Sequence, residues 1–280
     1  MQVIFNADDF GRSPSINAAV IKAHREGVLT SASLMVTGDA VEQAVDMAYC
    51  TPTLAVGLHL VVIDGRSVLP AEEIPHLVND QGYFLDDPLR AGLGYFFGSP
   101  QRRELEKELK AQFERFAATG LSLSHVDGHL HMHLHPAVFN LVVPLALQYG
   151  AQGLRLPRDD YWFALRYDRQ QFMTKLAWAF VFILLTRWCY KRLQGHRLAV
   201  TQKVYGLMQS GKMQEDYVVK LLRHLHVASA ELYFHPDLVN GPEALGPNAG
   251  DLLSLLSPQV WQVVAERSMH LATYPTLIDD

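Results

Sequence analysis

The alternation of short apolar runs with helical stretches is the feature that most constrains how this 280-residue chain can fold. Each strand-like run is followed by a longer segment with helical periodicity or a helix-cap signal. The predicted strands lie at 3–7, 31–36, 53–62, 121–129, 153–157, 197–202 and 231–236. Seven or eight such units predict an α/β fold, a distorted TIM-type (β/α) barrel forming a single domain over residues 1–280, with a doubly wound open sheet as the alternative.

Two segments depart from this alternation. Residues 64–100 are interrupted by Pro and Gly and are predicted to form an excursion over the barrel mouth. Residues 171–196 contain an apolar helix whose uncharged core, 176–186, is shorter than the ~20 residues of a membrane-spanning helix. Trp, Tyr, Lys and Arg within 175–192 are typical of a helix at a membrane surface. Peripheral membrane contact, a core helix and a homodimer interface remain open alternatives for this segment.

The composition excludes several classes of protein. With 49% hydrophobic and 19% charged residues, the chain is an ordered globular one. Its net charge of −5 argues against a nucleic-acid partner, because nucleic-acid binders are usually basic. The cysteines, Cys50 and Cys189, are too far apart in sequence to form a metal-type pair. No secretory signal is visible at the N-terminus, so we expect a cytoplasmic location, peripheral to the inner membrane if 175–192 binds lipid.

Residues able to do chemistry follow three of the predicted strands. Asp8 and Asp9 directly follow the first strand, His59 lies near the end of the third, and His235 ends the strand at 231–236. Barrel enzymes keep their active sites at the carboxyl ends of their strands. Adjacent carboxylates repel each other and favour a bound cation, although capping of the helix after Ser13 is the simpler explanation for the Asp pair alone. A lone histidine in an apolar strand is more often a hydrogen-bonded core residue.

The stretch SHVDGHLHMHLHP, residues 124–136, contains five histidines. In an extended chain His125 and His135 would lie about 33 Å apart, so one ion cannot bind all five. Two histidines at positions i and i+2 can reach one ion, and a neighbour such as Asp127 or His131 can orient a ligand by hydrogen bonding. His133 and His135 are expected to be polar loop residues.

Five motifs occur in order along most of the chain, namely NADDFG, GLHL, HVDGHLHMH, GLRLPRD and ELYFHP. Together they resemble those of the YdjC/ChbG-like carbohydrate deacetylases. The apolar segment 171–196 further resembles the hopanoid-biosynthesis-associated (HpnK-like) branch of that family, which acts on an acetylated sugar carried by a triterpenoid lipid.

The resemblance implies a metal-dependent hydrolase that removes an N-acetyl group from an amino sugar, here one carried on a hopanoid-type lipid. It implies one divalent ion, Mg or Zn, bound by Asp9, His59 and His129, with His125 as the alternative third ligand. It also implies that Asp8 is the general base and His235 the general acid. Arg155 and Arg158 would lie along the sugar site. Two other functions remain open. One is a metal-dependent phosphoesterase or amidohydrolase with a two-metal site, and the other is a non-catalytic sugar- or lipid-binding barrel.

Overall fold

The structure, a computed structural model, describes residues 1–169, 172–241 and 246–277. Its strands, in chain order, are β1 (Gln2–Phe10), β2 (Ser31–Leu34), β3 (Ala55–Leu60), β4 (His125–Gly128), β5 (Gly153–Leu154), β6 (Lys203–Tyr205), β7 (Ser229–Phe234) and β8 (His270–Leu271). Its helices are α1 (Pro14–Glu26), α2 (Val41–Tyr49), α3 (Pro88–Phe97), α4 (Ser99–Ala118), α5 (Pro136–Gln148), α6 (Tyr161–Tyr167), α7 (Phe172–Leu193), α8 (Glu215–His224), α9 (Ala249–Leu255) and α10 (Pro258–Glu266). Three short 3₁₀ helices complete the described elements: η1 (His129–Leu134), η2 (Leu207–Gln209) and η3 (Pro275–Leu277).

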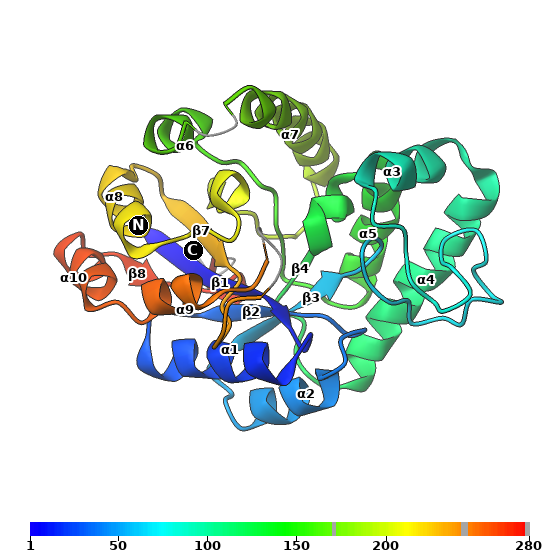
Figure 1. Cartoon of the computed structure of the whole chain (residues 1–280), viewed down its shortest axis with the longest axis horizontal. Helices are drawn as coiled ribbons and strands as arrows, with labels where there is room; N and C mark the ends of the chain where they lie inside the picture. Colours follow the sequence, from blue (N-terminus) through cyan, green and yellow to red (C-terminus); the bar gives the residue numbers. More distant parts are fainter. Residues whose placement is uncertain (170–171, 242–245, 278–280) are drawn as a thin grey trace.

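The strands form one parallel sheet in the order β5-β4-β3-β2-β1-β7-β6, with β8 paired to the beginning of β1. Figure 1 shows the strands at the centre of the molecule with the helices arranged around them. Strand β1 is buried along almost its whole length, and its neighbours β2 and β7 are buried nearly as completely. Because all strands run in the same direction, their carboxyl ends meet along one edge, and this edge positions the candidate site.

The sheet curls into a half-barrel within a single domain, so the prediction of an α/β fold is confirmed, but the described strands do not show a complete TIM-type barrel, distorted or regular. The edge strands β5 and β6 are only two and three residues long, too short to pair as a continuous ladder. Across the opening, an isolated bridge joins Gly153 to Ala199. The prediction of a strand at 197–202 is wrong, because these residues form only the bridge at Ala199 and β6 begins directly after them at Lys203.

Local sequence signals explain where the helices of the first half begin. The Ser13 side chain accepts a hydrogen bond from the Ile16 amide, and Pro14 occupies the first turn of α1, as the sequence predicts. The helix predicted at 101–116 is α4, which is slightly longer at both ends. After β4 the extended alternation of the histidine stretch stops at His129, and the chain turns into η1.

Between β3 and α4, residues 61–87 form irregular structure with two isolated bridges, followed by α3. The apolar segment at 171–196 is mostly α7; its first residue, 171, lies outside the described residues. Within the described part of the chain, α7 is the single helix long and apolar enough to cross a membrane by length and composition, and 17% of its most apolar window is buried.

Candidate metal centre with an acid–base pair

A β-bulge in β1 lets the two adjacent aspartates serve the same site. The pairing register between β1 and β2 shifts between Ala7 and Phe10, and Asp9 adopts a left-handed conformation with φ 63°. Successive side chains in a regular strand point to opposite faces, and a bulge redirects one of them. As a result, both Asp8 and Asp9 lie within ion-pair distance of histidines at the carboxyl edge of the sheet.

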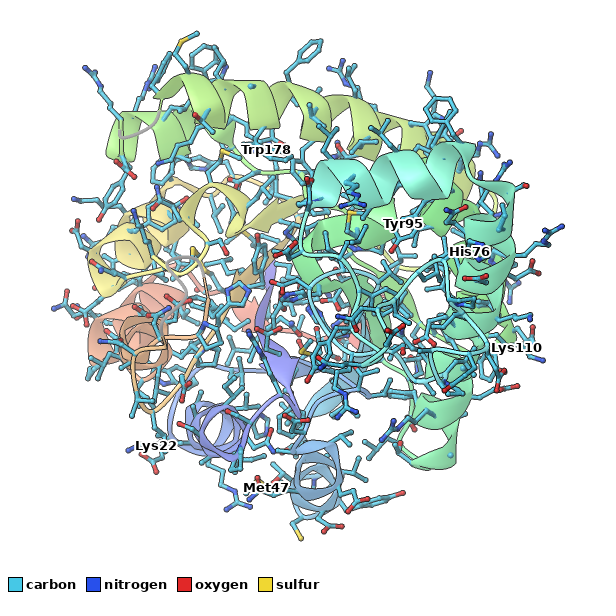
Figure 2. The ribbon with its side chains drawn as sticks, turned by 45° about the vertical axis from the view of Figure 1, so that its right-hand side comes forward. Lys22, Met47, His76, Tyr95, Lys110 and Trp178 are labelled. Carbon is cyan, nitrogen blue, oxygen red and sulfur yellow. The ribbon has the colours of Figure 1, made fainter. Side chains whose placement is uncertain are left out.

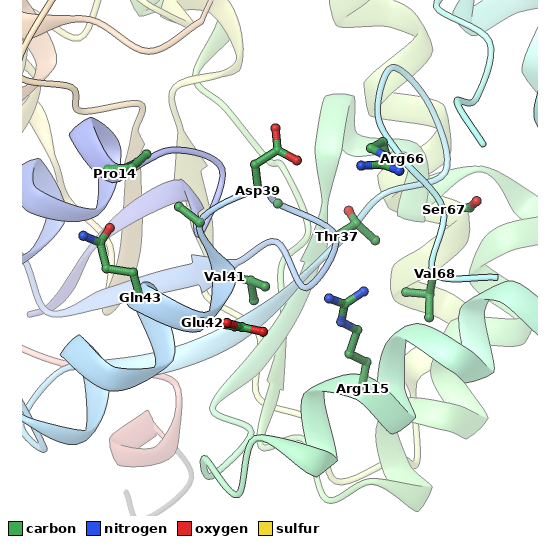
Figure 3. A pocket seen from close by; sticks show the side chains of 12 residues that line it. Pro14, Thr37, Asp39, Val41, Glu42, Gln43, Arg66, Ser67, Val68 and Arg115 are labelled. Carbon is green, nitrogen blue, oxygen red and sulfur yellow. The ribbon is translucent and has the colours of Figure 1, made fainter. Parts of the chain in front are cut away.

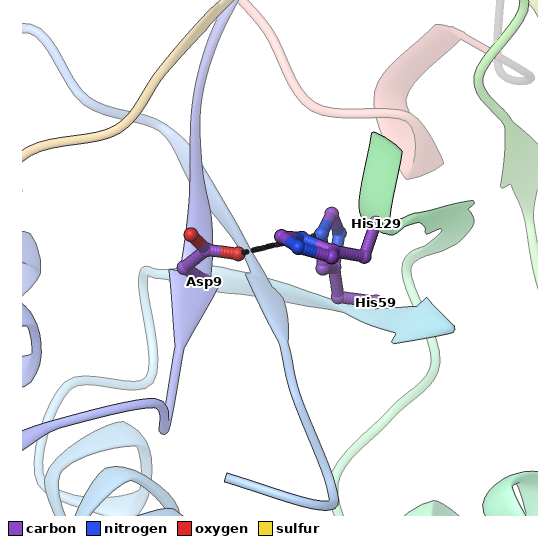
Figure 4. Close-up of side chains that lie close together, drawn as sticks. All are labelled: Asp9, His59 and His129. Carbon is purple, nitrogen blue, oxygen red and sulfur yellow. Dashed lines mark ion pairs between the residues drawn. The ribbon is translucent and has the colours of Figure 1, made fainter. Parts of the chain in front are cut away.

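Asp9, His59 and His129 converge on one point (Figure 4). The Asp9 Oδ1 atom lies 3.5 Å from His59 Nε2 and 3.4 Å from His129 Nδ1. Asp9 and His59 are almost completely buried, and His129 is 8% exposed. The three side chains come from the ends of β1 and β3 and from the residue after β4, which are far apart in sequence.

The geometry of this group is suited to a divalent ion. Ligand atoms held 2.0–2.1 Å from one ion at tetrahedral angles lie about 3.3 Å from one another, close to the two distances above. Asp9 Oδ1 and His59 Nε2 are buried, and neither has a hydrogen-bond partner among the described residues. Because unpaired buried polar atoms are costly, a cation between them would satisfy both. One carboxylate oxygen and two imidazole nitrogens suit Zn²⁺ and also permit other divalent ions.

Asp127 fixes the orientation of His59. The two residues are register partners on β3 and β4, and His59 Nδ1 lies 2.8 Å from Asp127 Oδ1. This contact leaves Nε2 facing Asp9, the arrangement usual for a metal-binding histidine with a carboxylate behind it. Burial would lower the pKa of His59, but the charges of Asp127, Asp8 and Asp9 raise it to about 9. The surroundings of His59 therefore stabilise positive charge.

The second carboxylate oxygen of Asp9 is also occupied. Burial would raise the pKa of Asp9, but His129, His235 and His59 together hold it well below its usual range. Arg12 Nη1 donates to Asp9 Oδ2 at 3.2 Å, which leaves Oδ1 directed at the two histidines. Asp9 is therefore an ionised carboxylate whose Oδ1 atom faces the two histidines.

Arg155 lies beneath the site and joins its carboxylates. Its guanidinium donates to both oxygens of Asp8 at 2.7 Å and contacts Asp127 and Glu231 at 2.8 Å. Arg155 is completely buried, which departs from the expectation that it lines a sugar site. Arg158 is exposed, and its guanidinium lies 5.3 Å from the Tyr190 ring centre on α7.

The same guanidinium limits the number of ions that the site can hold. Asp8, His59 and Asp127 form a second group with closely spaced ligand atoms. In this group both carboxylates already face the positive charge of Arg155, and His59 directs Nδ1 at Asp127. A second divalent ion would have to displace or repel Arg155, so the arrangement favours one ion, in the Asp9 group.

Asp8 and His235 form a pair beside the Asp9 group. Asp8 Oδ2 lies 3.9 Å from His235 Nε2, and His235 follows the end of β7. Besides its two bonds from Arg155, Asp8 accepts a hydrogen bond from the Asn6 side chain at 2.9 Å. The side chain of His235 is 13% exposed, so it is the more accessible member of the pair. A carboxylate and an imidazole this close can move a proton to and from one bound molecule.

The remaining histidines of 124–136 have other partners. His125, the alternative third ligand, is fully buried, with Nε2 3.1 Å from Ser33 Oγ and its ring stacked on Tyr274. His131 Nε2 lies 2.9 Å from the Tyr233 hydroxyl. His133 Nε2 lies 3.0 Å from the Arg155 carbonyl oxygen, so this residue is a buried structural contact and not a polar loop residue. Of the five histidines, only His129 belongs to a group with metal-ligand spacing among the described residues.

Sequence reasoning missed the polar residues that connect these groups. Ser33 Oγ donates to Asp127 at 2.7 Å and accepts from Asn6 at 2.8 Å. Glu231 accepts from Arg155 and from the Tyr274 hydroxyl. The sequence did hold a signal for Ser33. Ser31 and Ser33 alternate with apolar residues in a buried strand, and two serines on one inward face need polar partners.

A separate groove of about 700 Å³ opens beside the ends of β2 and α4 (Figure 3). Its polar lining includes Thr37, Asp39, Glu42, Arg66 and Arg115. Asp9, His59 and His129 are not among the described residues that line it. This groove is therefore distinct from the candidate metal centre.

The fold and site define a parallel α/β half-barrel with a buried Asp-His-His group at the carboxyl edge of its sheet. The family model described as "YdjC-like protein" matches residues 2–266, and the chain belongs to this family. A carbohydrate deacetylase of Brevibacillus brevis is 33% identical over 278 residues, which cover 99% of this chain and 100% of that protein. A carbohydrate deacetylase of Geobacillus stearothermophilus is 32% identical over 277 residues, covering 97% and 96%.

The fold is also shared with a solved structure. The crystal structure of a proposed cellobiose-phosphate cleavage protein from Enterococcus faecalis V583 matches with a TM-score of 0.77 at 24% identity. The match covers 99% of this chain and 98% of that chain. The half-barrel is therefore shared along its whole length.

Proposed function

We propose that this protein is a metal-dependent carbohydrate deacetylase that hydrolyses the N-acetyl group of an amino sugar. The observation that supports the proposal most strongly is the convergence of Asp9 Oδ1, His59 Nε2 and His129 Nδ1 within 4.8 Å of one another beside the Asp8–His235 pair. Two full-length relatives named carbohydrate deacetylases, each about a third identical in sequence, support the same reaction.

Asp9, His59 and His129 would hold one divalent ion, Zn²⁺ or Mg²⁺. Such an ion supplies polarisation of the amide carbonyl and a lower pKa for a water molecule. Asp127 keeps His59 in the tautomer that presents Nε2, and Arg12 keeps the Asp9 carboxylate turned toward the histidines. His131, bonded to Tyr233, supports the loop that carries His129. His125 could replace His129 as the third ligand only if its side chain gave up its contacts with Ser33 and Tyr274.

The proton transfers are assigned to Asp8 and His235. Asp8 accepts a proton from the attacking water, whose oxygen forms a bond to the amide carbon. Protonated His235 donates to the amine nitrogen as the carbon–nitrogen bond breaks, because an unprotonated amine is too basic to leave. The products are the free amino sugar and acetate. Arg155 holds Asp8 in place through two hydrogen bonds and acts as a positioning residue, whereas exposed Arg158 can contact the sugar.

The proposed substrate is an acetylated amino sugar carried on a lipid of the hopanoid type. Its support is the resemblance of 171–196 to the hopanoid-associated branch, together with the exposed apolar surface of α7. The protein would then work in the cytoplasm, peripheral to the inner membrane through residues 175–192, with a homodimer through the same helix as the alternative. No nucleic-acid partner is proposed, given the net charge of −5.

The test is acetate release from a panel of N-acetylated amino sugars and glycolipids, each incubated with wild-type protein and with metal-stripped protein. We expect acetate from at least one amino sugar, loss of activity on stripping and recovery with a divalent ion. An Asp8→Asn variant that releases acetate at the wild-type rate would show that the assigned base is wrong. If no amino-sugar substrate yields acetate, the proposed reaction itself is wrong.

A further inference from the structure

Helix α3 has an apolar face that the rest of the described chain leaves uncovered. Leu89, Leu93, Phe96 and Phe97 are exposed by 73, 52, 51 and 73%. Their spacing of three and four residues places them on one side of the helix. The opposite side holds the buried residues Ala91 and Tyr95, so α3 lies flat on the protein with its apolar face outward.

Helix α7 is arranged in the same way. Its buried residues, spaced three or four apart, are Ala179, Phe182, Thr186, Cys189 and Leu193. This stripe spans four turns, so one side of α7 packs on the protein along most of its length. The outward stripe contains Leu176, Phe180 and Leu184 and then changes to the basic residues Arg187 and Lys191. A helix packed in this manner can lie on a bilayer with its outer side, whereas crossing the bilayer would require it to leave the protein.

The two helices lie on the same side of the molecule and flank the histidine loop. Both α3 and α7 lie along the upper side in Figure 1 and in Figure 2, where Tyr95 and Trp178 mark them. Phe96 of α3 packs edge-on against His135, and Phe182 of α7 packs edge-on against His131. Both contacts are made by η1, the segment that begins with His129, or by the residue that follows it. The two helices that carry the outward apolar faces therefore border the loop that forms one wall of the candidate site.

The charge of these segments differs sharply from that of the whole chain. Helices α3 and α7 together contain five Lys or Arg and no Asp or Glu, a formal charge of +5. The whole chain has a net charge of −5, so the remainder carries −10. A two-fold dimer through this surface would bring two strongly positive faces together. An anionic bilayer is complementary to both the charge and the apolar side chains.

We propose that α3 and α7 form a two-helix docking surface for an anionic lipid bilayer, which presents the candidate site to a sugar headgroup at the membrane surface. The bilayer binding is independent of the proposed deacetylation, whereas the delivery of a lipid-linked substrate rests on it. The indoles of Trp162 on α6 and Trp178 on α7 are also exposed, and indoles are of the type that anchors in the headgroup region.

The binding test is cosedimentation of the full-length protein with vesicles of phosphatidylcholine, alone or mixed with phosphatidylglycerol. We expect binding to the anionic vesicles only, and loss of most of it when salt shortens the Debye length from about 10 Å at 0.1 M to about 3 Å at 1 M. Leu93→Glu and Phe97→Glu should each weaken vesicle binding about tenfold or more, because a large apolar side chain then no longer leaves water. Phe180→Glu tests α7 in the same way.

Leu253→Glu is the matched control, since Leu253 is 67% exposed on α9 and the same chemical change there should leave binding unaltered. Equal binding to both vesicle types, or no binding to either, would overturn the proposal. Unaltered vesicle binding by the α3 variants would exclude α3 from the surface. If Leu93→Glu instead converts a wild-type dimer to a monomer without changing vesicle binding, the surface serves a second copy of the chain.

An activity measurement separates this proposal from the proposed function. Acetate release from a soluble N-acetylated sugar should be unchanged in Leu93→Glu and Phe97→Glu, while release from a glycolipid embedded in anionic vesicles should fall in parallel with binding. Vesicle binding without acetate from any substrate would contradict the deacetylase function and leave the docking surface supported. Acetate from a soluble sugar without vesicle binding would contradict the docking surface alone.

Discussion

Replacing Arg155 by Ala should destabilise the protein more than any exposed substitution near the site. The guanidinium is completely buried and pairs with Asp8, Asp127 and Glu231 at 2.7–2.8 Å. Removing one partner of a buried ion pair costs about 3–5 kcal/mol, because the partner charges stay buried without compensation. At roughly 2–4 °C per kcal/mol, we expect the Tm of the metal-stripped protein to fall by about 10 °C.

The folding stability lost in Arg155→Ala should decrease as the pH falls. Burial would raise the pKa of Asp127, but the charges of Arg155 and His59 hold it well below its usual range. A carboxylate with a lowered folded-state pKa contributes stability above its unfolded pKa of about 4, and the contribution is lost as the pH falls through the folded value. The difference between wild type and Arg155→Ala should therefore be largest at neutral pH and shrink below about pH 4.

The difference in free energy of unfolding between wild type and Arg155→Ala can be measured by urea denaturation of the metal-stripped proteins at several pH values. Arg158→Ala is the matched control, because Arg158 lies three residues away and is exposed; its effect should stay within about 0.5 kcal/mol. A loss below about 1 kcal/mol for Arg155→Ala at neutral pH, or a loss that grows toward low pH, would refute the assignment of Arg155 as the cation that holds these carboxylates together.

Three further changes test separate parts of the site. Asp127→Asn should weaken binding of the divalent ion about 10–100-fold, measured by competition with a chelator, since Asp127 orients His59; unchanged affinity would argue against that role. His235→Asn should lower kcat for acetate release about 10²–10⁴-fold with metal affinity retained, whereas a full rate would remove His235 as the acid. Burial raises the pKa of Asp159 to about 6, so ionisation costs folding stability as the pH rises from about 4 through 6. Asp159→Asn should therefore gain stability relative to wild type between pH 4 and pH 8 in denaturation experiments, and a constant difference would contradict the shift.

Local signals in the sequence predicted much of the fold. The Ser13–Pro14 cap located the start of α1, and apolar periodicity located α4. Closure of the barrel could not be predicted in the same way, because it depends on the length and pairing of the edge strands. Apolar runs at 153–157 and 197–202 are equally compatible with long and short strands, and the structure forms the two-residue β5 in the first run and only an isolated bridge at Ala199 in the second.

The sequence placed Asp9, His59 and His129 at or near the ends of predicted strands, and such ends meet along one edge of a parallel sheet. The choice of these three residues as candidate ligands came from the family resemblance, and the structure brings them together. The environment of Arg155 was not accessible from the sequence. Its partners Asp8 and Glu231 lie far from it in sequence, and only the packed sheet brings their charges to one buried cation. The turn of the histidine stretch after His129 was also hidden, because it depends on left-handed backbone at Leu130 and His131, where no glycine signals a turn.

We propose that one divalent ion held by Asp9, His59 and His129 makes this protein a deacetylase. The most direct test of this proposal is the rate of acetate release from an N-acetylated amino sugar as a divalent ion is added stepwise to metal-stripped protein. We expect no release from the stripped protein and a linear rise that stops at one bound ion per chain, because Arg155 occupies the neighbouring carboxylates. A full rate without any ion, or a rise that continues to two ions per chain, would contradict the proposal.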